Sequence, residues 1–104
     1  MPKLTELDAE FLRAGEDGNV LHSVAFLHDA QGIWFECPLP NCKYGKHRIL
    51  VWFADRGTPD YCEPTPRWKA AGSSMYELSL TPSINCDVNG SGDWHGFVTN
   101  GEAK

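Results

Sequence analysis

The sequence lacks any long apolar run. No stretch approaches the roughly 18 apolar residues of a membrane span, and residues 1–8 contain no apolar core like that of a signal peptide. We therefore expect a soluble, cytoplasmic protein with no membrane contact. In that compartment the four cysteines are expected to be thiols or metal ligands rather than disulfides.

Positive charge is scarce. The chain has 9 basic and 14 acidic residues and a formal net charge of -5, whereas proteins that bind duplex nucleic acid concentrate positive charge. The one local basic cluster contains Lys43, Lys46, His47 and Arg48. We interpret it as a solvated loop, so nucleic acid is a disfavoured partner.

Motifs for catalysis are missing as well. The chain has neither the His-Glu-x-x-His pattern of zinc proteases nor the Cys-x-x-Cys pattern of zinc deaminases. Residues 89–93 are glycine-rich but lack the Lys-Ser/Thr of a phosphate-binding loop. Cys62 or Cys86 with His95 would supply a nucleophile and a base, but no third orienting group is evident. We assign no catalytic residue and favour a binding protein over an enzyme.

What the chain does contain is a compact set of strand signals. Its 104 residues suit a single domain, 1–104, and its hydrophobic content of 41 % with four tryptophans supports a small core. Short apolar runs between glycine and proline turns predict strands at residues 33–35, 48–54, 77–81 and 94–99. The third of these is expected to end at Pro82.

The remaining segments are less regular. Residues 4–13 and 20–30 mix helical and strand periods, and we favour a strand for the first. Turns are predicted at 14–19 and 87–93, and a loop at 55–66. The pattern predicts a mostly β protein, a small antiparallel sheet or sandwich with at most one short helix.

The stretch 32–47 looks like a metal-binding knuckle between two of these strands. Cys37 and Cys42 have four residues between them, at the wide end of the spacing of zinc ligands that share one turn. Cys86 and His95 flank a turn and are the best candidates for the second pair, with His47 and Cys62 as alternates. The sequence thus predicts a zinc site of Cys37, Cys42, Cys86 and His95. The competing interpretation is that the cysteines are buried apolar thiols.

Several motifs occur together in order along the chain. They are Cys37-Pro38, Gly45-Lys46-His47, Pro82-Ser83-Ile84 and Trp94-His95-Gly96-Phe97. This set resembles a family of small phage and prophage proteins of unknown function. In that family a cysteine often shortly precedes the last histidine, whereas Asp93-Trp94 stand there in this chain. The resemblance implies a metal-binding β domain, a phage context and the cytoplasm of a bacterial host, and it leaves the fourth ligand open.

These observations lead to one principal hypothesis and two alternatives. We expect a zinc-stabilised β module that binds a host or phage protein, as a host-takeover or anti-defence factor. The first alternative is a zinc-dependent hydrolase with an open metal position. The second is a zinc-knuckle nucleic-acid binder that uses Lys43, Lys46 and Arg48, with Tyr44 as a stacking ring.

Overall fold

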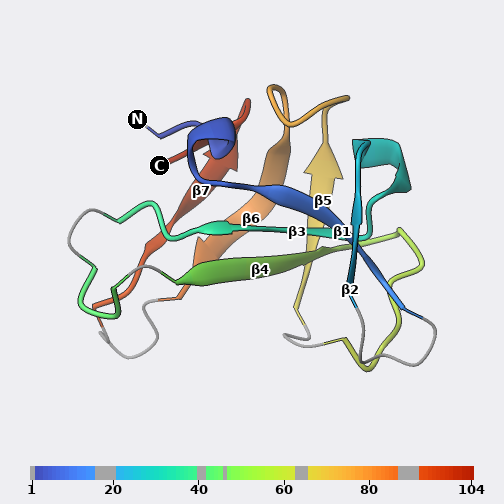
Figure 1. The fold of residues 1–104 in the computed structure, drawn as a ribbon, viewed down its shortest axis with the longest axis horizontal. Coiled ribbons are helices and arrows are strands. Elements are labelled where there is room, and N and C mark those ends of the chain that lie inside the picture. Colours follow the sequence, from blue (N-terminus) through green and yellow to red (C-terminus); the bar gives the residue numbers. More distant parts are fainter. Residues whose placement is uncertain (1, 16–20, 40–41, 46, 63–65, 87–91) are drawn as a thin grey trace.

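The protein is built almost entirely from β-strands (Figure 1). A computed structural model describes residues 2–15, 21–39, 42–45, 47–62, 66–86 and 92–104. Its strands are β1 (Glu10–Ala14), β2 (Leu21–Val24), β3 (Gly32–Glu36), β4 (Arg48–Phe53), β5 (Arg67–Ala71), β6 (Ser79–Asn85), β7 (His95–Thr99) and β8 (Glu102–Ala103). Two single-turn 3-10 segments, η1 (Leu4–Glu6) and η2 (Leu27–Asp29), are the helical elements of the described residues. The predicted mostly β fold class is confirmed.

The strands form one sheet in the order β2-β1-β3-β4-β5-β6-β7-β8. Every neighbouring pair is antiparallel except β4 and β5, which pair in parallel through Trp52 with Arg67 and Phe53 with Trp68. The sheet is therefore mixed rather than purely antiparallel. A parallel pair needs a crossover of about a dozen residues or more, and the proline-containing segment between Phe53 and Arg67 provides it.

The sheet turns a corner at this parallel pair. Figure 1 shows β1, β3 and β4 running across the direction of β5, β6 and β7. The two halves contribute to one apolar cluster, in which Ile33 and Phe35 of β3 join Leu80 and Ile84 of β6 and Val98 of β7. The core thus lies between the two halves, and it brings the β3–β4 hairpin near the start of β7.

The sequence located the strands near the knuckle well and others less well. Residues 33–35, 48–54 and 94–99 correspond to β3, β4 and β7. The prediction that a strand ends at Pro82 was wrong, because β6 continues to Asn85. Pro82 has no backbone N–H to donate to a neighbouring strand. The irregular register between Leu80 and Ile84 lets this exposed proline lie inside β6.

At the N-terminus, β1 forms only from Glu10, after the η1 turn, and residues 20–30 divide into β2 and η2. The strands β5 and β8 were not predicted. Of the predicted turns at 14–19 and 87–93, residues 16–19 and 87–91 lie outside the described residues, as does Lys46.

Candidate metal centre

The β3–β4 hairpin gathers three side chains that can bind a metal. Cys37 follows the last residue of β3, and its N–H donates to the His47 carbonyl at 2.8 Å, just before β4. The Gly45 N–H donates to the Cys42 carbonyl at 2.9 Å, in a tight turn that Gly45 permits with a φ of 72°. The knuckle predicted from the sequence is thus a closed hairpin loop, and it places Cys37, Cys42 and His47 together.

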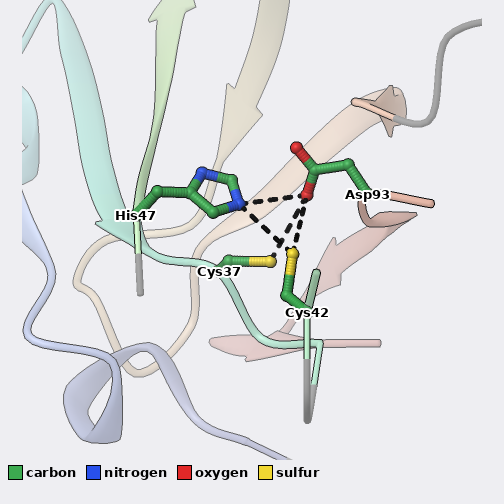
Figure 2. A group of neighbouring side chains, drawn as sticks. All are labelled: Cys37, Cys42, His47 and Asp93. Carbon is green, nitrogen blue, oxygen red and sulfur yellow. Dashed lines mark hydrogen bonds and ion pairs between the residues drawn. The ribbon is translucent and has the colours of Figure 1, made fainter. Parts of the chain in front are cut away.

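The fourth side chain, Asp93, comes from the segment that leads into β7. The next residue, Trp94, is buried and packs edge-on against Phe35 of β3, with ring centroids 6.0 Å apart. The Trp94 carbonyl accepts a hydrogen bond from the Cys86 N–H at 2.8 Å. These contacts fix the backbone beside Asp93, whose carboxylate then points toward the hairpin loop (Figure 2).

The four ligand atoms form a tight group. Cys37 Sγ, Cys42 Sγ, His47 Nε2 and an Asp93 carboxylate oxygen all lie within 4.8 Å of one another. Asp93 Oδ1 is 3.6 Å from each sulfur and 3.1 Å from His47 Nε2, and Cys42 Sγ is 3.6 Å from the same nitrogen. All four side chains are partly buried and converge on one point (Figure 2).

These separations match the edges of a tetrahedron around a zinc ion. With zinc bonds of about 2.3 Å to sulfur and about 2.0 Å to nitrogen and oxygen, sulfur lies about 3.5 Å from nitrogen or oxygen, and nitrogen about 3.3 Å from oxygen. The donor set also fits, because zinc binds thiolate, imidazole and carboxylate in four-coordinate sites. The residues present therefore fit a metal ion in donor type and in the four separations of 3.1–3.6 Å.

The electrostatics of the cluster favour a cation as well. Burial, with Cys42 and Asp93 nearby, raises the pKa of the Cys37 thiol to about 12. The pKa of Asp93 is lowered although burial opposes this, because the Trp94 N–H donates to it and His47 and the two thiols stabilise the carboxylate. Without a metal the Cys37 thiol thus keeps its proton, and a bound cation would release it.

The structure brings together only part of the predicted ligand set. Cys37 and Cys42 belong to the cluster, and the alternate ligand His47 joins them. Cys86 lies near enough for Asp93 and Cys42 to raise its pKa after the larger effect of burial, yet it is not in the four-atom group. His95 instead contacts Ser83, with 3.2 Å between Nε2 and Oγ. The set Cys37, Cys42, Cys86 and His95 stays a prediction, and the geometry favours His47 and Asp93 for the second pair.

Asp93 was not predicted as a ligand, although the sequence held a signal. It occupies one of the two positions before His95 that the resemblance had marked as a departure, because a cysteine was expected shortly before this histidine. The other alternate, Cys62, is buried near Arg67 and outside the cluster. None of the four cysteines is in a disulfide.

Comparisons with known proteins found no matching family model, no matching curated protein and no matching solved structure. In the part of the chain that the structure describes, no helix is long and apolar enough to cross a membrane. The functional argument therefore rests on the chemistry of this chain alone.

Proposed function

We propose that this protein is a zinc-stabilised β module that acts by binding a protein partner. The observation that carries the proposal is the group of Cys37, Cys42, His47 and Asp93, whose ligand atoms lie within 4.8 Å of one another, with four separations of 3.1–3.6 Å that are close to the edges of a zinc tetrahedron. Two sulfur ligands argue against calcium and magnesium, which take oxygen ligands. The ion would join the β3–β4 hairpin to the segment before β7.

The number of ligands favours a structural ion over a catalytic one. Structural zinc sites are closed by four protein ligands, whereas catalytic sites keep one position open for water. The cluster supplies four ligand atoms, one each from two cysteines, a histidine and an aspartate. This composition supports the binding module over the alternative of a zinc-dependent hydrolase.

The basic residues beside the site give little support to nucleic-acid binding. Arg48 is paired with the Asp8 carboxylate at 2.7 Å and lies over the Trp34 ring. The Lys43 ammonium lies over the Tyr44 ring, 5.5 Å from its centroid. It therefore covers the ring that was proposed to stack on a base. Among the described residues beside the site, Arg48 and Lys43 are thus engaged in contacts within the protein. The chain as a whole is acidic.

A protein partner fits the charge and the surface better. The net charge of -5 suits a partner with a basic site, such as a host enzyme that binds nucleic acid. Large apolar side chains also remain exposed, among them Tyr76 at 75 % and Phe26 at 61 %. The phage-like motifs support action in the cytoplasm of a bacterial host, as a takeover or anti-defence factor.

The metal is tested by native mass spectrometry and cobalt substitution. We expect one zinc ion per wild-type chain, and cobalt spectra with sulfur charge-transfer bands and tetrahedral d–d intensity. Cys37→Ser should lose the ion, whereas Cys62→Ser, a buried cysteine outside the cluster, should keep it. A wild-type protein that binds neither metal would overturn the zinc site.

The partner is tested by affinity capture from bacterial lysate with the zinc-loaded protein as bait. We expect a stoichiometric host or phage protein whose retention weakens as salt is raised. Tyr76→Ser and Phe26→Ser variants then locate the contact surface. Recovery of nothing above an unrelated acidic bait would count against the partner while leaving the metal site intact.

A further inference from the structure

Two motifs that the metal site does not use meet on the outer face of the sheet. Ser83 lies in β6 and His95 begins β7, and the two strands pair Ile84 with Gly96 and Asn85 with His95. Ser83 Oγ and His95 Nε2 are 3.2 Å apart. When the imidazole proton is on Nδ1, the Ser83 hydroxyl donates to Nε2, which is the arrangement of an activated serine.

Both residues are held on rigid parts of the fold. The Ser83 carbonyl accepts a hydrogen bond from the Trp68 indole N–H at 3.2 Å, and the next residue, Ile84, is buried in the core. On the other strand, the buried Trp94 precedes His95. A nucleophile and a base on paired strands keep their mutual geometry better than the same groups on loops.

A hollow of about 290 Å³ opens beside His95. Its lining is largely apolar and includes Pro38, Leu39, Trp94 and Ala103. Pro38 directly follows Cys37, and Trp94 directly follows Asp93, so two lining residues of this hollow are neighbours in sequence of the metal cluster. His95 thus lines an apolar hollow that can hold an acyl chain, and Ser83 contacts His95 from the neighbouring strand.

We propose that Ser83 and His95 form a nucleophile–base pair that cleaves esters or amides whose acyl part is apolar. Ser83 Oγ attacks the acyl carbon while His95 Nε2 takes the hydroxyl proton. The bond from the acyl carbon to the leaving oxygen or nitrogen breaks, and His95 returns the proton to that atom. Water then attacks the acyl-serine, His95 takes its proton and passes it to Ser83, and the carboxylic acid is released.

This activity goes beyond the proposed zinc-stabilised binding module and does not use the metal ion as a reactant. The metal would act on it only through structure, because Asp93 stands two residues before His95. The assignment also gives His95 a partner other than the metal, in contrast to the ligand set expected from the sequence.

The experiment labels the full-length zinc-loaded protein with a fluorophosphonate probe, followed by peptide mapping. We expect modification at Ser83, its loss in Ser83→Ala, and a rate at least about a hundredfold lower in His95→Ala, since a positioned base contributes about 10²–10⁴-fold. The matched controls Ser23→Ala and His28→Ala change an exposed serine and an exposed histidine of β2 and η2, and they should label as the wild type does.

A second measurement follows hydrolysis of p-nitrophenyl acetate and p-nitrophenyl octanoate by the same proteins. An initial burst of nitrophenol equal to the enzyme concentration is expected, with the octanoate favoured, and Ser83→Ala should abolish the burst. Zinc content is measured on every variant. A wild-type protein that remains unlabelled at Ser83, or a His95→Ala variant that labels normally or loses its zinc, would overturn the proposal without touching the test on Cys37.

Discussion

At the scale of single residues, the central question is which imidazole belongs to the candidate metal site. His47 Nε2 lies 3.1 Å from Asp93 Oδ1 and 3.6 Å from Cys42 Sγ, whereas His95 Nε2 lies 3.2 Å from a serine hydroxyl. A ligand must reach the same point as the other three, and only His47 meets that condition in the described cluster.

His47→Ala is therefore expected to weaken zinc binding by at least about a hundredfold, because even residues behind the ligands change metal affinity about 10–100-fold. His95→Ala should leave the zinc affinity near that of the wild type. Competition with a chromophoric chelator measures both values. The opposite order would restore His95 to the ligand set.

The pH dependence of the metal-free protein follows from Cys37. Its pKa is raised from 9.0 to about 12 by burial and by the nearby Cys42 and Asp93, so the folded state holds this proton more tightly than the unfolded chain does. The stability that this provides is present below about pH 9 and is lost as the pH rises toward 12.

We accordingly expect the urea midpoint of the metal-free protein to fall between about pH 9 and pH 11, and Cys37→Ser to remove that fall. In the same way, zinc affinity should rise with pH near neutrality, about tenfold per unit for each proton released. A midpoint that is flat across this alkaline range would show that the Cys37 thiol is not perturbed.

At the scale of elements, β7 is the strand on which both sites depend. It follows Asp93, starts at His95 and pairs with β6 and with β8. Gly96 lies where β7 approaches the chain end, since a Cβ there would come within 2.1 Å of the Lys104 carbonyl oxygen and 2.7 Å of the Trp94 ring. Any side chain at this position must displace both of them.

Gly96→Ala should destabilise the fold by about 1–3 kcal/mol, the usual cost of overpacking, and so lower the melting temperature by roughly 4 °C or more. The matched test is a double-mutant cycle with deletion of Lys104, whose backbone pairs with Phe97. If the Lys104 carbonyl is the obstacle, the two changes will be less than additive. Strict additivity would locate the clash at Trp94.

At the scale of the whole molecule, the candidate metal site joins parts of the chain that are far apart. Cys37 and Asp93 are separated by 56 positions in sequence, yet Cys37 Sγ and Asp93 Oδ1 are 3.6 Å apart. Metal binding at a structural zinc site is largely folding free energy, about 10 kcal/mol or more in small modules, whereas a whole domain has about 5–15 kcal/mol of net stability.

Chelation should therefore destabilise the fold and lower the thermal midpoint by more than about 10 °C. Cys37→Ser should reproduce this loss, because a hydroxyl is a poor zinc ligand, whereas Cys62→Ser should stay sensitive to chelator. Circular dichroism with and without chelator measures all three proteins. An unchanged midpoint, with no zinc present beforehand, would identify Cys37 and Cys42 as packing residues.

The sequence by itself determined the local features of this protein. Alternating and apolar runs located β3, β4 and β7, because a strand exposes its pattern within a few residues. The spacing of Cys37 and Cys42 predicted a closed knuckle, because the turn between them is short. The mostly β class followed from the same short-range signals.

Only the tertiary structure decided how these pieces meet. The parallel pairing of β4 with β5 creates the corner in the sheet, and no local pattern indicates it. That corner, with the packing of Trp94 on Phe35, brings Asp93 to the hairpin loop and leaves His95 facing Ser83. Sequence spacing fixes ligands that share one turn, whereas ligands from distant segments are chosen by the packing of the core between them.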